Sequence, residues 1–459
     1  MSETIAAIAT GDELSAIGVI RISGDDCIEI VDRIFSPMSG RKIADVRDRE
    51  LVLGSLRDRD GEVIDQCLCT ISRAPNSYTG ENTAELQCHG SPLVLRFALE
   101  SLFAAGARQA LQGEFTKRAF LNGRMDLVQA EAVVDLVDAE TPEAAKNAAG
   151  QLGGAMLLRT DAIYAKLIGI AAHYHAVLDY PDEDIEEFEL SGYEESLEQA
   201  EAELHRLLDS FERGRIMTRG VPAAIIGKPN AGKSSLLNAL LGYDRAIVTD
   251  IPGTTRDTIE ERVLLGGVLL RLIDTAGLRD TGDPVESLGV TRARRAAQDA
   301  ELVLALYDGA QSWSEEDDSV TETARSASRA IAIINKQDLP SGLGDTKLAL
   351  LRSGFRECVQ VSAKTGEGLG ELADAVRRLY PVPTARAHGE ILTNARQAES
   401  VEAALISLRA AMDAMRCGVT PDAVLTDLEL SMQALGRLTG RVVSQDVLED
   451  IFSRFCVGK

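Results

Sequence analysis

Basic residues are scarce in this sequence relative to acidic ones. Among 459 residues there are 48 Lys and Arg against 72 Asp and Glu, so the formal net charge is -24 and the pI is about 4.7. A general electrostatic attraction to nucleic acid or to an anionic membrane is therefore excluded. Any contact with nucleic acid has to use a local basic patch that works against this field.

Long apolar runs and a secretory leader are also lacking. No apolar run approaches the ~20 residues that cross a bilayer, and the start Met1-Ser2-Glu3 lacks a basic region followed by an apolar one. The seven cysteines are odd in number and have no framework spacing, which is typical of a reducing compartment. We therefore expect a cytoplasmic protein.

Metal-ligand spacing is absent as well. The stretch 179–203 holds twelve carboxylates and no Lys or Arg. A solvated helix face and loop explains this run, and the alternative, a metal site, lacks histidine at ligand spacing. His173 and His175 have no ligand partner either, so no zinc site is predicted, while Cys67 and Cys69 share one strand face and are assigned to the core.

What the sequence does contain is the pattern of a multi-domain chain. The length indicates roughly three domains. Short β-rich runs at 17–22 and 68–71, with helical candidates at 25–35 and 92–105, predict an α+β domain with a mixed or antiparallel sheet over residues 1–118.

Hydrophobic periodicity predicts helices on both sides of a central segment. Residues 218–383 alternate apolar strands with helical stretches, which is typical of a parallel α/β sheet. Residues 119–217 and 384–459 are predicted to be helical, and helix starts in the second stretch are marked at Thr393, Thr420-Pro421 and Ser444. Because an inserted unit needs its termini close together, we predict one split all-α domain with an inserted α/β domain.

The strongest motif lies between an expected strand at 221–226 and a helix that opens at residue 235. Residues 227–234 read Gly-Lys-Pro-Asn-Ala-Gly-Lys-Ser, the phosphate-binding pattern G-x-x-x-x-G-K-[ST] in its strand–loop–helix context. Glycines let backbone N–H groups wrap phosphates, and the helix N-terminus adds partial positive charge. We expect Lys233 to reach the β- and γ-phosphates and Ser234 to ligate Mg²⁺.

Three further motifs follow in order at expected strand ends, where such sheets bind ligands. Asp274-Thr275-Ala276-Gly277 places a carboxylate beside the metal and the Gly277 N–H near the γ-phosphate. In Asn335-Lys336-Gln337-Asp338, the last carboxylate can accept two hydrogen bonds from guanine N1–H and its 2-amino group, which adenine cannot supply. Ser362-Ala363-Lys364 suits the guanine carbonyl. The set predicts a GTP-hydrolysing domain.

The hydrolytic residues differ from those of Ras-like GTPases. Leu278 stands where those enzymes place a water-orienting Gln, and leucine cannot hydrogen-bond water. With Asn230 in the phosphate loop and the segment 249–257 downstream, the chain resembles GTPases that use K⁺ in place of an arginine finger and are activated by dimerising their G domains. The resemblance implies that K⁺ is held by Asn230 and the carbonyls of three residues, Thr249, Ile251 and Thr254.

The same resemblance assigns the remaining roles at the nucleotide. Thr255 is expected on Mg²⁺, and Glu286 matches the water-positioning acid, with a carboxylate favoured at a helix N-terminus as the alternative. Catalytic candidates here are Glu286, Lys233 and Asn230. The nucleotide-binding set also includes Ala231, Gly232, Ser234, Ser235, Thr249, Asp250, Ile251, Pro252, Gly253, Thr254, Thr255, Asp274, Thr275, Ala276, Gly277, Asn335, Lys336, Asp338, Ser362, Ala363 and Lys364.

Motifs outside the GTPase domain resemble the tRNA-modification GTPase family MnmE, also called TrmE. They are 77–82, Ser-Tyr-Thr-Gly-Glu-Asn; 85–90, Glu-Leu-Gln-Cys-His-Gly; 113–124, from Gly-Glu-Phe-Thr to Asn-Gly-Arg; 178–183, Leu-Asp-Tyr-Pro-Asp-Glu; and the terminal Cys456-Val457-Gly458-Lys459. The family's architecture is an N-terminal tetrahydrofolate-binding and dimerisation domain, a split helical domain and an inserted G domain, which agrees with the periodicity. Residues 11–18 depart from the family, because two acids replace a basic, glycine-rich turn before Arg21.

The resemblance implies a homodimeric, K⁺-dependent GTPase that acts with an FAD-dependent partner of the MnmG (GidA) family. The pair uses methylene- or formyl-tetrahydrofolate to install a carboxymethylaminomethyl or aminomethyl group at C5 of the wobble uridine of certain tRNAs. It also implies that Arg21, Glu85, Arg124 and Lys459 line the folate pocket; taken alone, each reads as a surface charge. Cys456 reads equally as a catalytic thiol or as a tail cysteine. A GTP-dependent ribosome-assembly switch without modification activity is the alternative function.

Overall fold

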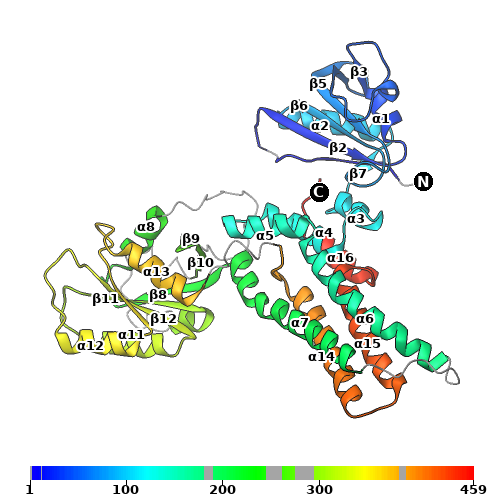
Figure 1. The fold of residues 1–459 in the computed structure, drawn as a ribbon. Helices are drawn as coiled ribbons and strands as arrows, with labels where there is room; N and C mark the ends of the chain where they lie inside the picture. Colours follow the sequence, from blue (N-terminus) through cyan, green and yellow to red (C-terminus); the bar gives the residue numbers. More distant parts are fainter. Residues whose placement is uncertain are drawn as a thin grey trace. The chain divides into compact units, whose positions relative to one another are not determined.

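The chain forms two compact units in a computed structural model that describes residues 3–11, 13–179, 190–243, 261–273, 294–381 and 389–458. The first unit comprises Met1–Val134, Gln151–Leu197 and Ile406–Lys459. The second comprises Asp135–Gly150 and Glu198–Leu405. Figure 1 shows the elements of both.

The first unit contains a seven-stranded sheet in the order β3-β4-β5-β6-β2-β1-β7. Its strands are β1 Ile5–Ile8, β2 Ile17–Ser23, β3 Phe35–Pro37, β4 Val52–Arg57, β5 Val63–Ser72, β6 Thr83–His89 and β7 Arg108–Gln109. All neighbours are antiparallel except β1 and β7, which are parallel. The predicted α+β domain with a mixed sheet is confirmed.

Helices α1 Cys27–Ile34 and α2 Pro92–Ala104 pack on this sheet, and the short 3-10 helix η1 Ile43–Asp45 lies against α1. Alternation along β2 buries Ile20 and Ile22, because successive side chains of a strand point to opposite faces. The apolar stripes of α1 and α2 complete the core, which also contains Cys27, Cys67, Cys69 and Cys88.

The segments before and after the α/β domain are helical. Their helices are α3 Glu114–Leu121, α4 Leu127–Val137, α5 Pro142–Leu152, α6 Ala155–Asp179, α7 Leu190–Arg219, α14 Ala395–Arg416, α15 Pro421–Thr439 and α16 Gln445–Ser453. In the first unit α6 packs along α15. In the second, Asn147 Nδ2 donates to the Ile391 carbonyl at 3.3 Å, and the Leu392 N–H donates to Ser210 Oγ at 3.1 Å. Segments before and after the α/β domain thus pack together, as the split helical domain requires. The domain boundaries given above remain predictions.

Two predicted helix starts are observed and one is displaced. Thr420 and Ser444 are the N-caps of α15 and α16. At α14 the capping side chain is Asn394, whose Oδ1 accepts the Gln397 N–H at 3.0 Å. Thr393, one residue earlier, instead donates its hydroxyl to Asp135 Oδ2 at 2.8 Å. No helix within the described ranges is long and apolar enough to cross a membrane.

The second unit carries a six-stranded sheet in the order β13-β12-β11-β8-β10-β9. Its strands are β8 Val221–Gly227, β9 Glu261–Leu265, β10 Val268–Leu272, β11 Leu302–Asp308, β12 Arg329–Asn335 and β13 Glu357–Gln360; its helices include α8 Lys233–Tyr243, α11 Glu315–Arg325, α12 Asp345–Gly354 and α13 Leu369–Leu379. The strands are parallel except β9, which is antiparallel at the edge.

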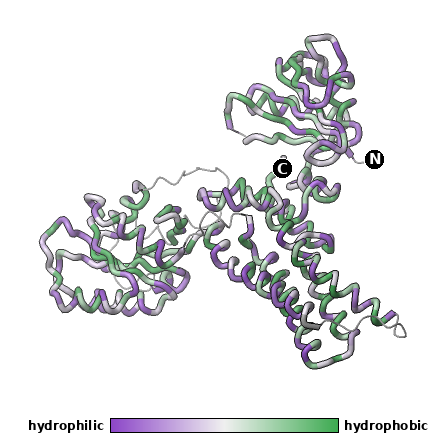
Figure 2. Tube along the Cα trace, viewed as in Figure 1, coloured by the Kyte–Doolittle hydropathy of each residue, from purple (hydrophilic) through white to green (hydrophobic). Residues whose placement is uncertain are grey.

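Each face of this sheet has its own hydrophobic core. α8 and α13 contribute to one core, and α11 and α12 contribute to the other. The central strands are accordingly hydrophobic along their length, whereas the covering helices alternate (Figure 2), as expected for a parallel sheet buried on both sides. Because these strands are parallel, the carboxyl ends of β8, β11, β12 and β13 lie at the same end of the sheet. The predicted nucleotide motifs begin at this end.

Candidate functional site

The loop that joins β8 to α8 closes around the amino group of its own lysine. Lys233 Nζ donates to the carbonyls of Gly227 at 2.8 Å and Lys228 at 3.0 Å. Burial of this ammonium group lowers its pKa from the ordinary value. Asn230 and Gly232 adopt positive φ angles of 60° and 99°, which turn the chain tightly enough for backbone N–H groups to face one point. The loop has the form of a phosphate cradle.

A buried ion pair anchors this loop to the start of α11. Lys228 Nζ lies 2.8 Å from Asp317 Oδ2, and the two side chains are only 6% and 3% exposed. The same Asp317 oxygen accepts hydrogen bonds from the Ser314 N–H at 2.9 Å and the Ser314 hydroxyl at 3.0 Å. Sequence reasoning missed this pair, although the Ser314–Asp317 spacing is itself a capping signal.

Asn335, at the end of β12, joins three loops. Its Nδ2 donates to the Ala231 carbonyl in the phosphate loop at 2.9 Å, and its Oδ1 accepts the Ala363 N–H at 3.0 Å. A Cβ on Gly232 would lie 2.4 Å from that Nδ2, so only glycine fits there. Asn335, a member of the predicted nucleotide-binding set, thus holds the phosphate loop and the 362–364 loop against the end of β12.

Lys336 also links the end of β12 to the phosphate loop. Its Nζ donates to the Asn230 carbonyl at 2.9 Å and pairs with Asp308 Oδ2 at 2.7 Å. Asp308 ends the buried strand β11 and was also missed by sequence reasoning. A charged residue directly after a continuous apolar run was the available signal.

Asp338, the predicted acceptor for guanine, lies exposed beyond the end of β12. Ser362 Oγ donates to Asp338 Oδ1 at 2.7 Å, and this hydrogen bond lowers the pKa of Asp338 from its ordinary value. The ionised carboxylate can accept hydrogen bonds, which the predicted contact with the donor edge of guanine needs. Lys364 is exposed beside Ala363.

Several predicted residues lie outside the described part of the chain. These are Thr249, Asp250, Ile251, Pro252, Gly253, Thr254, Thr255, Asp274, Thr275, Ala276, Gly277, Leu278, Glu286 and Lys459. The predicted contacts of these residues with K⁺, Mg²⁺, the γ-phosphate, the attacking water and folate stay predictions. Much of the acidic stretch 179–203 lies there too.

A second group of predicted residues lies on the N-terminal sheet. Arg21 on β2 and Glu85 on β6 occupy paired positions, with Arg21 Nε 3.1 Å from Glu85 Oε1. The Arg21 guanidinium lies 5.4 Å from the ring centre of Tyr78 and 5.8 Å from that of Phe115. This arrangement offers a planar cation, a carboxylate and aromatic faces within one small region.

The chain terminus lies against the same domain. Val457 forms an antiparallel bridge with Gln112, and the Gly113 N–H donates to the Cys456 carbonyl at 3.4 Å. The Cys456 side chain is exposed. Arg124 is exposed too, and its stem lies near Gly80. The structure brings Arg21 and Glu85 into contact, and it records no contact that joins them to Arg124 or Cys456 among the described residues.

The sheet, its phosphate loop and its guanine-recognition motif define a P-loop GTPase. A family model for the MnmE helical domain matches residues 127–456, and one for the N-terminus of the GTP-binding protein TrmE matches residues 4–124. The tRNA modification GTPase MnmE of Acetivibrio thermocellus is 42% identical over 459 residues, covering 100% of this chain and 99% of its own. That of Symbiobacterium thermophilum is 44% identical over 460 residues, with the same coverage.

The chain belongs to the MnmE (TrmE) family of tRNA modification GTPases. It is therefore a GTP hydrolase that acts in tRNA modification. Among solved structures, translation elongation factor SelB from Methanococcus maripaludis matches 36% of this chain and 35% of its own at 18% identity and a TM-score of 0.26.

Proposed function

We propose that this GTPase runs a K⁺-dependent cycle that drives a one-carbon modification of the wobble uridine of certain tRNAs. The observation that carries the K⁺ proposal is the conformation of Asn230. Its φ is 60°, its side chain is exposed on the phosphate loop, and its carbonyl accepts a hydrogen bond from Lys336. An amide oxygen and the carbonyls of Thr249, Ile251 and Thr254 are the donor type that replaces water around K⁺.

Bound K⁺ would offset the negative charge that develops between the β- and γ-phosphates. Ser234 and Thr255 would hold Mg²⁺ through their hydroxyl oxygens, with Asp274 beside it. Leu278 cannot orient water, and Glu286, which matches the water-positioning acid of the family, would take that role. Dimerisation of two G domains would exclude water from this site and so strengthen the electrostatic contacts within it.

The test compares GTP turnover in KCl and NaCl at equal ionic strength. We expect Na⁺ to slow the wild-type chain by about 100-fold or more, and Asn230→Ala to be slow in both salts. Asn238→Ala, an exposed asparagine on α8, is the matched control and keeps the K⁺ response. Equal wild-type rates in the two salts would remove the K⁺ assignment and leave the GTPase intact.

We also propose that the N-terminal domain binds a tetrahydrofolate derivative. Arg21, Arg124 and Lys459 suit an anionic or carbonyl-rich ligand, and Glu85 suits the donor edge of a pterin. The fit rests on the Arg21–Glu85 contact, because the two side chains are 26% and 34% exposed and both can reach a ligand. Cys456 is the candidate catalytic thiol for transfer of the one-carbon unit from the folate to the wobble uridine.

Folate binding to the full chain tests this pocket directly. Arg21→Ala and Glu85→Gln should each weaken 5-formyl-tetrahydrofolate binding by about 10-fold or more, as loss of a charge-assisted hydrogen bond implies. Arg33→Ala, on the exposed side of α1 in the same domain, is the control. Unchanged affinity in both site variants would contradict the pocket.

In the cell the chain is proposed to act in the cytoplasm as a homodimer with an FAD-dependent partner of the MnmG family. Nucleoside analysis of tRNA from a strain that lacks the protein tests the reaction. We expect wobble uridines to lose the carboxymethylaminomethyl or aminomethyl group, and a Lys233→Ala copy to fail in complementation. Unchanged wobble uridines together with accumulated immature ribosomal particles would instead favour the ribosome-assembly switch.

A further inference from the structure

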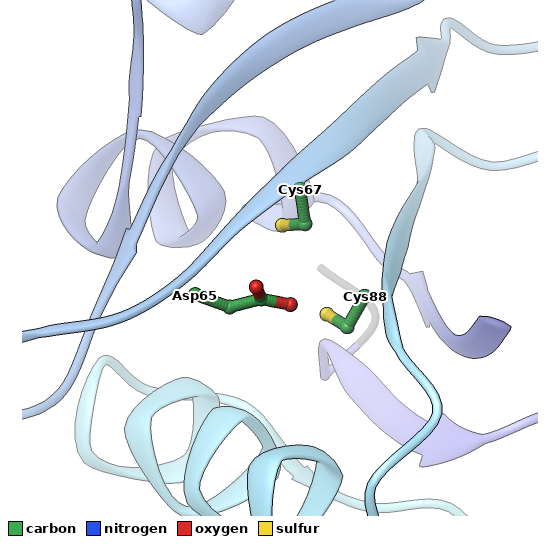
Figure 3. Close-up of side chains that lie close together, drawn as sticks. All are labelled: Asp65, Cys67 and Cys88. Atoms are coloured by element: carbon green, nitrogen blue, oxygen red, sulfur yellow. The ribbon is translucent and has the colours of Figure 1, made fainter. Parts of the chain in front are cut away.

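Two thiols and a carboxylate converge inside the N-terminal sheet, apart from the residues proposed for folate. Asp65 and Cys67 are alternate residues of β5, so they share a face. Cys88 comes from the neighbouring strand β6, whose register continues from the pair Leu68 and Gln87. The ligand atoms of all three lie within 4.8 Å of one another, and Figure 3 shows the side chains pointing toward a common centre.

His89 orients the carboxylate of this cluster. Its ring Nδ1 lies 2.7 Å from Asp65 Oδ1, and its backbone N–H donates to Asp65 Oδ2 at 2.9 Å. The Asp65 side chain is only 8% exposed, whereas the His89 side chain is 75% exposed. Carboxylates that ligate a metal are themselves hydrogen-bonded by outer residues, and His89 supplies such bonds to Asp65.

Small buried cysteines often serve as core residues, and Cys67 and Cys88 are only 3% and 2% exposed. That explanation does not account for Asp65. A buried carboxylate is stabilised by pairing, hydrogen bonds or a bound metal. The hydrogen bonds that Asp65 accepts in the described part of the chain come from the exposed His89 at its outer side, and the two thiols on its buried side carry no positive charge. A bound cation would supply that charge.

We propose that Asp65, Cys67 and Cys88 bind one Zn²⁺ ion, with His89 as the positioning residue and a water molecule as the fourth ligand. Thiolates select a soft or borderline ion over Mg²⁺ or Ca²⁺, which prefer sets of oxygen ligands. Ligand atoms at the usual ~2.0–2.3 Å from tetrahedral zinc are roughly 3.5–3.8 Å apart. The three ligand atoms lie within 4.8 Å of one another, so each pair would approach by roughly 1.3 Å at most. Binding releases the two thiol protons to solvent, without a change in oxidation state.

The ion would tie β5 to the end of β6 on the core face of the sheet. Glu85 lies on the opposite face of β6, because positions 85 and 88 differ by an odd number. The zinc site is therefore separate from the proposed folate pocket, and its test does not depend on folate binding.

The experiment titrates Co²⁺, as a spectroscopic substitute for Zn²⁺, into the full chain after chelation and under a phosphine reductant. We expect one Co²⁺ per chain, with a thiolate-to-metal absorption band that Zn²⁺ abolishes by displacement. Cys67→Ser and Cys88→Ser should each lose about half the band intensity. Asp65→Asn and His89→Ala should keep the band and weaken binding by roughly 10- to 100-fold.

Cys69→Ser is the matched control, since Cys69 is equally buried on the same strand, and it should bind as the wild type does. A second control replaces the exposed Cys417 and Cys456 by serine and should also retain the band. Absence of a band in the folded wild-type chain would overturn the proposal, as would a band lost with the exposed cysteines. The wild-type titration and the His89 variant keep the test decisive if a buried-cysteine variant fails to fold.

Discussion

Replacing Lys228 by methionine should destabilise the G domain strongly, because it removes the cation from a buried pair and leaves the partner charge behind. The Nζ–Oδ2 distance is 2.8 Å, and both side chains are nearly inaccessible. Breaking such a pair from one side costs about 3–5 kcal/mol. Asp317 keeps two hydrogen bonds from Ser314, so we expect Lys228→Met to lower the free energy of unfolding by about 3 kcal/mol.

A double variant separates the ion pair from simple loss of packing. Lys228→Met with Asp317→Leu leaves no unpaired charge, and replacement of a buried pair by apolar residues is often close to neutral. Loss of the Asp317 cap on α11 costs about 1 kcal/mol. The double variant should therefore be more stable than Lys228→Met alone, although it carries one more substitution.

Trp313 supplies a local probe for this measurement. It is the single tryptophan of the sequence, it precedes Ser314, and it stacks on Tyr307 with ring centres 5.5 Å apart. Its fluorescence during a urea titration of the nucleotide-free chain reports unfolding of the G domain alone.

Arg377→Met is the control, because the Arg377–Asp374 pair is 61% and 52% exposed and such pairs contribute about 0–1 kcal/mol. The reasoning is refuted if Lys228→Met stays within about 0.5 kcal/mol of wild type, or if the double variant is the least stable.

Three further predictions concern single positions. Gly232→Ala forces a Cβ into Asn335 at a φ of 99°, and should weaken GTP binding at least ~10-fold, measured by titration calorimetry. Asp338→Asn should lower GTP affinity about 100-fold and raise affinity for xanthosine triphosphate, because the amide donates where guanine donates; an unchanged preference would exclude Asp338 from base recognition. Burial opposes ionisation of Glu114, but hydrogen bonds from Arg108 and others lower its pKa from 4.5 to about 2. The ionised Glu114 thus contributes its full stabilisation above pH 4.5, and this contribution is lost as the pH falls toward 2. In Glu114→Gln, the loss in free energy of unfolding over this pH range should be smaller than in the wild type by about 1–2 kcal/mol, measured by thermal unfolding at several pH values.

The fold class and the motif residues could be predicted because local spacing encodes them. A continuous apolar run followed directly by a glycine-rich loop gave the strand at 221–226, and the observed β8 spans Val221–Gly227. The polar end of the apolar run at 330–334 indicated Asn335 and Asp338 in the same way. Parallel strands then bring these ends to one edge of the sheet without further information.

The side-chain pairs that hold the loops could not be predicted in this way. Lys228 and Asp317 are 89 positions apart, and each alone reads as a surface charge. Only the packing of α11 beside β8 makes both buried and mutually dependent. The convergence of Asp65 and Cys88 has the same origin, because strand register across β5 and β6, rather than any short motif, brings them together.

These contacts also separate the roles of three residues within the predicted guanine-recognition motif. Asn335 bonds to the Ala231 carbonyl and the Ala363 N–H, and Lys336 bonds to the Asn230 carbonyl, so these side chains set the shape of the phosphate loop as well as the base site. Asp338 contacts Ser362 at the exposed rim instead. If Asp338 reads the base as predicted, its substitution should alter guanine specificity without disturbing the phosphate loop. A change at Asn335 would leave two backbone groups unpaired and affect both ends of the nucleotide at once.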